Sequence, residues 1–455
     1  MKEMTVGEIT RAVGGTLLCG DPGKIIDNVQ YDSRAVNSSS LFVPIKGEKV
    51  DAHKFIEQCL EKGAATFTEN DAPQGAVQPC IKVDDTRAAL QKLAAVYRAQ
   101  FSDLRLIGVT GSVGKTSTKE MIAAALSAGL DVMKTSGNKN SQIGMPSTMF
   151  DISDKNQAAV IEMGMSEFGE MDRLCDISRP DIAVMTNIGT AHIENLKTQE
   201  NIRSEKFKIT KHFDKDGLLL INGDDKLLRE LLGKQPFAVK SFGMGEDNDF
   251  RAADITTEGF STSFVCIAKD SERRFTIPAL GVHSVSNALA AIAAARYLGL
   301  DDDTIQKGLS SYKNAPMRQQ IHALPGLTLI DDSYNASPEA TKVSIDVLMS
   351  ISKGKSIAVL ADMLELGERS AELHRSVGEH LAKAGTDALI AIGSESENTA
   401  AAAKENGCSS VFTVSNNEQA YEKLLTLVED GSTVLIKGSR GMHTDEIVKK
   451  LLEKA

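Results

Sequence analysis

The chain has 455 residues, of which 42% are hydrophobic and 25% are charged, as in ordinary folded proteins. This length exceeds what one hydrophobic core usually serves, so we expect two or three domains. The formal net charge of −11 argues against a protein that depends on attraction to nucleic-acid phosphates. We therefore expect any phosphate ligand to meet a local site, and no nucleic-acid partner.

Membrane and export signals are also missing from the sequence. No run approaches the roughly 20 apolar residues that cross a bilayer, and the N-terminal stretch has no long apolar core. The six cysteines are scattered without C-x-x-C pairs, which favours reduced thiols over a disulfide frame or a zinc site. We expect a cytoplasmic protein without a membrane partner, acting as a monomer.

The first expected domain is a small α/β unit over residues 1–100. Short apolar stretches at 40–45 and 80–83 are typical of strands, and residues 86–101 have helical periodicity.

The pattern changes at residue 104. An apolar run typical of a buried parallel strand (104–110) is followed by a glycine loop and a helical stretch (115–129). Further buried-strand candidates alternate with helical stretches, at residues 158–164, 181–189 and 217–225. We therefore expect a doubly wound middle domain over residues 101–314.

A boundary is expected near Asn314, because an Ala-rich helix (284–299) is followed there by a proline break. Beyond it, strand candidates again alternate with helices, at residues 327–334, 355–363, 386–393, 409–414 and 432–439. This pattern predicts a Rossmann-like domain over residues 315–455, with functional residues at the strand ends.

The stretch "VTGSVGKTSTKE", which begins at Val109, resembles a phosphate-binding loop of unusual spacing. In the common pattern G-x-x-x-x-G-K-[ST] the first glycine would fall at Val109, but the glycines here are Gly111 and Gly114. Backbone N–H groups at a helix N-terminus favour a phosphate, Lys115 can reach its outer oxygens, and Thr116 can offer a hydroxyl to Mg²⁺. The alternative is a tight turn with a surface lysine, and the K-T-S sequence favours the phosphate loop.

Two further side chains follow buried strands. Glu162 ends one apolar strand, and His192 follows another after a glycine turn, so the two can meet at one edge of the sheet. Oxygen ligands with one imidazole suit Mg²⁺ or Mn²⁺. A helix cap for Glu162 and a hydrogen-bonded structural histidine are the alternatives, and spacing alone does not decide between the two interpretations.

Taken together, the motifs "TGSVGKTS", "EMG", "NIGTAH", "GVHSVSNALAA" and "DDSYNASP", in this order, resemble the Mur ligase family of ATP-dependent amide-forming enzymes. The similarity covers essentially the whole chain, because "YDSRAVNSSSLFVPIKGEKVDAHKF" is similar to the family's N-terminal UDP-sugar module and "VLIKGSRGM" to its C-terminal end. The shorter phosphate loop is the rule in that family. The resemblance implies a three-domain α/β fold, with a UDP-binding module, a central P-loop ATPase domain and a mobile Rossmann-like domain that binds the incoming dipeptide.

The resemblance is greatest to members that add D-alanyl-D-alanine to a UDP-N-acetylmuramoyl-tripeptide through an acyl phosphate, in peptidoglycan precursor synthesis. It implies ATP and two Mg²⁺ ions as cofactors, and a role in cell wall biogenesis, cell shape and cell division. Two alternatives remain. One is a ligase of the same family that adds a single amino acid, or glutamate to a folate, and the other is a P-loop nucleotide switch without bond-making chemistry.

The resemblance also implies the nucleotide contacts. The phosphates would be wrapped by Gly111, Ser112, Val113, Gly114, Lys115, Thr116 and Ser117. Asn287, with His283 beside it, would contact the adenine, and Arg318 and Asp332 would hold the nucleotide from the C-terminal domain. Taken in isolation, Asn287 would be a helix-capping or polar surface residue and Arg318 a loop cation.

The implied metal ligands are Thr116, Glu162 and His192, with Lys206 as a fourth if CO₂ carbamylates it. Carbamylation converts a cation into an anionic oxygen ligand. The neighbours of Lys206 depart from the family pattern, so an exposed helix lysine is the alternative. The implied catalytic set is Lys115, Glu162, His192 and Lys206.

The remaining implied residues would bind the two substrates. They comprise a uridine-nucleotide group, a pair for the peptide arm and a group for the dipeptide: Ser33, Arg34, Lys46 and Gly47; Asn138 and Asn140; and Asn335, Ser337, Asp362, Glu365 and His374. Without the resemblance, these stretches would be ordinary turns, a helix cap and a surface acidic helix.

Overall fold

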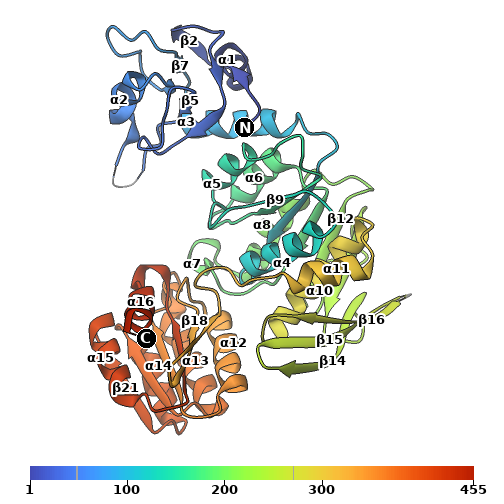
Figure 1. The fold of residues 1–455 in the computed structure, drawn as a ribbon, viewed down its shortest axis with the longest axis vertical. Helices are drawn as coiled ribbons and strands as arrows, with labels where there is room; N and C mark the ends of the chain where they lie inside the picture. The colour runs from blue at the N-terminus through green and yellow to red at the C-terminus, as the bar shows by residue number, and fades with distance from the viewer. Residues whose placement is uncertain (48–49, 270, 455) are drawn as a thin grey trace.

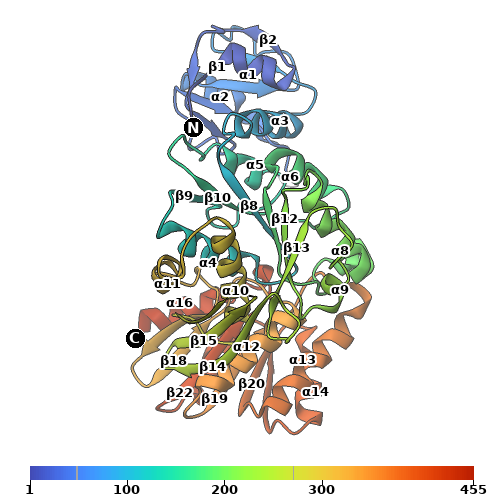
Figure 2. The same ribbon diagram turned by 90° about the vertical axis from the view of Figure 1, so that its right-hand side faces the viewer.

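The computed structural model describes residues 1–47, 50–269 and 271–454. Three sheets of five, nine and six strands follow one another along the long axis of the molecule, and a two-stranded ribbon joins β1 (Met4–Thr5) to β3 (Ile25–Ile26) (Figures 1 and 2). Among the described residues, none of the helices combines the length and apolarity of a membrane span. The mixed α/β class expected from the sequence is confirmed.

The N-terminal sheet is parallel except for one edge strand. In sheet order its strands are β2 (Thr16–Cys19), β7 (Cys80–Lys82), β6 (Ala65–Thr68), β5 (Ser40–Phe42) and β4 (Asn28–Gln30). Its helices are α1 (Val6–Val13), η1 (Ala52–Phe55), α2 (Ile56–Glu61) and α3 (Thr86–Arg98). Side-chain caps define the helix starts: Thr5 and Glu8 form a capping box on α1, and Asp85 accepts from Ala88 N on α3.

Helix α3 joins the N-terminal module to the central domain. Its apolar face, with Leu90, Leu93 and Tyr97 fully buried, lies in a core cluster shared by both units. The Tyr97 hydroxyl donates to Ile152 O at 2.7 Å and accepts from Lys2 N at 2.7 Å. The module is therefore packed directly on the central domain.

The central sheet has nine strands. In sheet order they are β16 (Ser271–Ile277), β15 (Ser261–Ala268), β14 (Phe250–Glu258), β13 (Ala238–Gly243), β12 (Leu218–Asn222), β11 (Ile182–Met185), β8 (Arg105–Thr110), β10 (Ala158–Glu162) and β9 (Val132–Lys134). Strands β8 to β14 run parallel to one another. Strands β15 and β16 continue the sheet beyond β14 with antiparallel pairing, an extension that the sequence analysis did not predict.

Strand β8 marks the topological switch point of this sheet. The chain adds β10 on one side of β8 and β11 on the other, which opens a crevice at the carboxyl end of β8. The glycine loop occupies that crevice and leads into α4. The other helices of this domain are α5 (Gly144–Met149), α6 (Glu170–Ser178), α7 (Ile193–Leu196), α8 (Gln199–Phe207), η2 (Lys208–Thr210), α9 (Lys226–Arg229), α10 (Val282–Tyr297) and α11 (Asp302–Ser310), with α4 at Lys115–Ser127.

The C-terminal sheet is parallel except for the edge strand β17. Its order is β17 (Gln320–Leu324), β18 (Leu327–Asp331), β22 (Ser432–Lys437), β19 (Ser356–Ala361), β20 (Ala388–Ile392) and β21 (Ser410–Val414). The helices are α12 (Pro338–Ile351), η3 (Gly367–Arg369), α13 (Ser370–Ala384), α14 (Ser396–Glu405), α15 (Asn417–Leu427), η4 (Arg440–Met442) and α16 (Asp445–Lys454). Two apolar clusters pack on this sheet, so it has a core on each face, as in a Rossmann-like domain.

Candidate active site

A cavity of about 570 Å³ lies between the central and C-terminal domains. The central domain contributes the glycine loop and the segments after β10 and β11, and the C-terminal domain contributes the segments after β18, β19 and β22. The carboxyl ends of parallel strands from two sheets therefore face one cavity, whose volume is in the range of ligand sites.

The glycine loop is shaped for a close approach of its backbone to a ligand. Gly111 and Gly114 have φ of 151° and 85°, and a Cβ at Gly111 would overlap Thr186 Oγ1. Lys115 folds back over the loop, where its Nζ donates to Gly111 O at 2.9 Å. Asn187 braces the loop by accepting from Val113 N at 2.8 Å. The sequence analysis did not single out Thr186 or Asn187, although both follow the buried strand that precedes His192.

Glu162 lies at the end of β10 with 1% of its surface exposed. One carboxylate oxygen accepts from Thr116 Oγ1 at 2.9 Å, and the other accepts from Asn140 Nδ2 at 2.7 Å. The structure thus brings together three predicted site residues from three separate segments. These oxygen atoms beside a phosphate loop suit Mg²⁺, which usually binds one or two carboxylates together with substrate phosphates. Among the residues that the structure describes, no cluster of three or more His, Cys, Asp and Glu side chains forms a metal site from protein groups alone.

His192 lies on the same cavity, in a left-handed backbone conformation with φ of 61°. Its Nδ1 is 2.8 Å from Glu365 Oε2, which belongs to the C-terminal domain. This pairing with His192 lowers the pKa of Glu365. Glu365 was predicted to contact the dipeptide. In the structure its carboxylate contacts His192 across the domain boundary.

Lys206 is a buried residue of α8, with 1% of its surface exposed. The exposed helix lysine considered in the sequence analysis is therefore wrong. Burial lowers the pKa of Lys206 well below its ordinary value, and the nearby Lys115 cation lowers it further, whereas Glu205 opposes the shift. Lys206 is not among the residues that line the cavity, so it lies behind the lining, within the electrostatic reach of Lys115.

Asn287 and His283 project from the first half of α10 toward the cavity. Asn287 is 8% exposed, and its Oδ1 accepts from Thr118 Oγ1 at 2.8 Å. His283 Nε2 donates to Gln319 Oε1 at 2.8 Å, and burial lowers the pKa of this imidazole. Asn287 is thus neither an exposed surface residue nor the cap of α10, whose N-cap is Gly281.

Two cation contacts define the C-terminal side of the cavity. The Arg318 guanidinium stacks 3.9 Å from the centre of the Tyr334 ring. Asp332 accepts from Lys437 Nζ at 2.5 Å, and the side chains of both residues are almost fully buried. Burial lowers the pKa of Lys437, and the Asp332 charge opposes that shift. Lys437 and Tyr334 were not predicted as site residues, although the sequence analysis quoted the segments that contain them.

Asn335 and Ser337 also line the cavity. Asn335 Oδ1 accepts from Arg440 N at 3.3 Å, and Ser337 caps α12 by accepting from Ala340 N at 3.4 Å. The helix-capping alternative for Ser337 is therefore observed, together with its position on the cavity wall.

Asp362 and His374 do not reach the cavity lining. Asp362 Oδ1 accepts from Ser396 N at 2.7 Å, at the start of α14. His374 is fully buried, and its Nε2 accepts from Met363 N at 3.0 Å. In the structure, these polar atoms shape the segment that carries Glu365, and direct contacts with the dipeptide stay a prediction.

The N-terminal residues of the predicted uridine site lie at the opposite end of the molecule from the C-terminal domain (Figure 1). Ser33 O accepts from Lys62 Nζ at 2.8 Å, and the exposed Arg34 pairs with Asp32 at 2.7 Å. Lys46 and Asp51 form an isolated bridge across the loop that contains Gly47. Asn138 is exposed beside the cavity residue Asn140.

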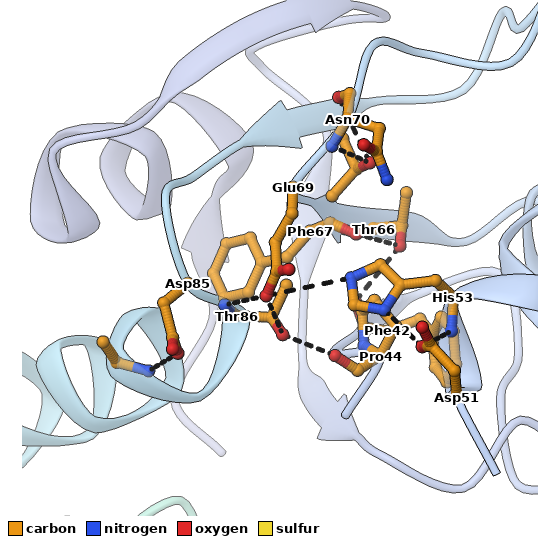
Figure 3. A network of polar contacts seen from close by, with 12 residues as sticks. Phe42, Pro44, Asp51, His53, Thr66, Phe67, Glu69, Asn70, Asp85 and Thr86 are labelled. Carbon is orange, nitrogen blue, oxygen red and sulfur yellow. Dashed lines mark hydrogen bonds and ion pairs between the residues drawn. The ribbon is translucent and has the colours of Figure 1, made fainter. Parts of the chain in front are cut away.

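A polar network, which the sequence analysis missed, anchors the loop that contains Gly47 (Figure 3). His53 Nδ1 donates to Asp51 Oδ1 at 2.7 Å, and its Nε2 lies 4.0 Å from Glu69 Oε1. Glu69 Oε1 also accepts from Thr86 N at 3.0 Å, and the Thr86 hydroxyl donates to Pro44 O at 2.6 Å. The loop is thereby connected to the first residue of α3.

Comparisons with known proteins bear on the whole chain. Three profiles of one family match it: the Mur ligase family catalytic domain at residues 25–98, the Mur ligase middle domain at 109–295, and the Mur ligase glutamate ligase domain at 317–440. The UDP-N-acetylmuramoyl-tripeptide–D-alanyl-D-alanine ligase of Bacillus subtilis (strain 168) is 38% identical over 459 residues, covering 100% of this chain and 99% of that protein. The chain belongs to the Mur ligase family.

Solved structures of Mur ligases agree with this assignment. A MurF structure from Acinetobacter baumannii superposes with a TM-score of 0.92 at 31% identity, covering 100% of this chain and 99% of that one. The MurF ligase of Thermotoga maritima in complex with ADP gives a TM-score of 0.84 at 31% identity, covering 94% of this chain and 98% of that one. The family and the three-domain fold inferred from the motifs are confirmed.

Proposed function

We propose that this Mur ligase adds D-alanyl-D-alanine to a UDP-N-acetylmuramoyl-tripeptide, with hydrolysis of ATP to ADP, in cytoplasmic peptidoglycan precursor synthesis. The observation that carries the proposal is the cavity, where the phosphate loop of one domain faces Arg318, Asp332 and Lys437 of the next. Full-length similarity to the Bacillus subtilis ligase and to the ADP-bound Thermotoga maritima structure supports both the reaction and the nucleotide.

The proposed reaction has two steps. The terminal carboxylate of the tripeptide attacks the γ-phosphate of ATP, which forms an acyl phosphate and releases ADP. The amine of the dipeptide then attacks the acyl carbon, phosphate leaves, and an amide bond remains. Both steps gather negative charge, which the loop N–H groups and Lys115 would offset once Lys115 Nζ exchanges Gly111 O for phosphate oxygens.

Thr116 and Glu162 would hold Mg²⁺, and Asn140 would orient the Glu162 carboxylate through its 2.7 Å hydrogen bond. Bound Mg²⁺ would supply charge neutralisation at the transferring phosphoryl group. His192 would present Nε2 to a metal ion, and Glu365 Oε2 lies 2.8 Å from its Nδ1, although this contact lacks the geometry of a hydrogen bond.

Carbamylation of Lys206 fits its surroundings. An amine must be neutral to add CO₂, and the lowered pKa of Lys206 increases the neutral fraction near neutral pH. The addition of CO₂ to the amine releases one proton and leaves a carbamate anion. An anion at this buried position would be stabilised by the Lys115 cation, and the smaller effect of the Glu205 charge would oppose this.

We assign the domains as residues 1–100 for the UDP-muramoyl end of the substrate, 101–314 for ATP and 315–455 for the dipeptide. The predicted uridine contacts lie in the N-terminal module, and Asn140 lies at the cavity. An extended UDP-peptide can therefore run from the module to the phosphate loop, with its terminal carboxylate beside ATP. We propose that the enzyme acts as a monomer.

ADP release from the purified chain tests the function. The proposal requires release that depends on both the UDP-tripeptide and D-alanyl-D-alanine. Release with a single amino acid in place of the dipeptide would indicate another ligase of the family, and nucleotide exchange without any acceptor would indicate a switch.

A further inference from the structure

The loop of residues 186–192 lies between the phosphate loop and the C-terminal domain. On the phosphate side, Ser112 N donates to Asn187 O at 3.0 Å, and Gly189 N donates to Ser112 Oγ at 2.9 Å. Any movement of the 186–192 loop therefore acts directly on the groups that would cradle ATP.

On the other side, the loop meets Glu339, the second residue of α12 in the C-terminal domain. Glu339 Oε1 accepts from Thr190 N at 3.1 Å and from Thr190 Oγ1 at 3.0 Å. The carboxylate packs against bare backbone, because a Cβ at Gly189 would lie 3.0 Å from Glu339 Cδ. Two residues further along the loop, His192 meets Glu365 at 2.8 Å. Two carboxylates of the C-terminal domain thus hold one short loop.

The contact is not a by-product of helix capping. Ser337 already caps α12 through Ala340 N, so Glu339 is free to direct its carboxylate away from its own helix. The hydrogen bond to Glu372 is the main cause that raises the pKa of Arg369, and the Glu339 charge adds only a smaller effect, because the guanidinium pairs with Glu372 at 2.7 Å. Both side-chain hydrogen bonds that Glu339 accepts therefore come from Thr190.

We propose that Glu339 is a positioning residue that holds the C-terminal domain closed over the cavity and, through Thr190, sets the 186–192 loop against the phosphate loop. The proposal rests on the proposed function in taking the closed arrangement as the one that performs the ligation. Nothing in the predicted catalytic or binding set included Glu339 or Thr190.

One oxygen of the Glu339 carboxylate is left without a partner in the described part of the chain. Glu339 Oε2 is buried and has no hydrogen-bond partner among the described residues. A buried acceptor without a partner is unfavourable, and water restores its hydrogen bonds when the domains separate. This oxygen therefore lowers the net stability that the Glu339 contact gives to the closed arrangement.

Glu397 supplies a matched control. It is the second residue of α14, as Glu339 is of α12, and it is exposed in the same domain. Replacing either by Ala removes one acidic group from the first turn of a C-terminal-domain helix. The Glu339→Gln variant keeps an oxygen that can accept from Thr190 and removes the charge.

Small-angle X-ray scattering of the full chain, with and without ADP and Mg²⁺, reports closure independently of catalysis. Glu339→Ala should increase the radius of gyration and lower kcat by about tenfold, because two hydrogen bonds across the domain boundary are lost. Glu339→Gln should restore most of the original radius of gyration and kcat. Glu397→Ala should match the unmodified chain in both. Thr190→Val should produce a smaller opening that does not add to that of Glu339→Ala.

Unchanged scattering and turnover in Glu339→Ala would overturn the proposal, as would equal losses in Glu397→Ala. Strictly additive effects of Glu339→Ala and Thr190→Val would also overturn it. If the unmodified chain shows no ligase turnover while Glu339→Ala alone opens the structure, the closure contact stands and the proposed function fails.

Discussion

The buried ion pair of Lys437 and Asp332 leads to a quantitative prediction. The side chains are 3% and 9% exposed, and Nζ lies 2.5 Å from Oδ2. We expect Lys437→Met to destabilise the C-terminal domain, because methionine fills similar space and leaves the Asp332 carboxylate buried without its counter-charge.

The size of the effect follows from the contacts that remain. Removing one partner of a buried ion pair costs about 3–5 kcal/mol. Asp332 would keep its hydrogen bonds from Ser344 Oγ at 2.6 Å and Gln319 N at 3.2 Å, so we expect a value near the lower end of that range. Adding Asp332→Asn removes the stranded charge, and the double variant should recover most of the loss.

Urea unfolding measures the change in the free energy of unfolding. Native-state hydrogen exchange of the β18 and β22 amides shows whether the loss of stability lies in the C-terminal domain. A loss below about 1 kcal/mol in Lys437→Met would refute the reasoning, since that is the range of exposed pairs. A double variant no more stable than the single one would also refute it, because the cost would then not come from an uncompensated charge.

Three further predictions concern the phosphate and metal sites. Lys115→Ala should abolish ADP formation while circular dichroism shows an intact fold, and unchanged turnover would contradict the ATP site. Glu162→Ala should shift the Mg²⁺ titration of activity to much higher concentrations, because the proposed Mg²⁺ site would lose its carboxylate. An unaltered titration would return Glu162 to a structural role, as the partner of Thr116 and Asn140. Lys206→Ala should be nearly inactive and partly rescued by acetate. In the unmodified chain, lowering the pH through the depressed pKa of Lys206 should protonate its amine and reduce the amount of carbamate. ¹³C NMR with labelled bicarbonate measures the carbamate. An active enzyme without that signal would exclude the modification.

The sequence predicted the parallel strands that are buried on two faces, but it missed β13, whose first three residues are at least partly exposed. Residues 104–110, for example, form β8 at Arg105–Thr110, and residues 432–439 contain β22. The antiparallel extension was missed although β15 contains an apolar run, because its neighbours β14 and β16 have mostly exposed residues and no such run. Strand β9 has only three residues, too few for any periodicity.

The phosphate loop and Glu162 were predictable for a local reason, since the loop directly follows the buried strand β8 and Glu162 is the last residue of the buried strand β10. Contacts across the domain boundary had no such signal. Glu365 is 173 residues from His192, and Glu339 is 149 residues from Thr190, so their pairing depends on how two separate sheets dock. Asp362 and His374 contact groups of their own domain and lie outside the cavity lining, so their contacts with the dipeptide stay a prediction.

The most direct test of the account is ADP release by the purified chain with the UDP-tripeptide and a series of acceptors. The account predicts rapid release with D-alanyl-D-alanine and at least about tenfold slower release with free D-alanine, because a half-empty dipeptide site leaves buried polar groups unpaired at about 1–3 kcal/mol each. Equal release with D-alanine, L-lysine or glutamate would contradict the substrate assignment. Release that needs no acceptor would contradict the ligase reaction itself.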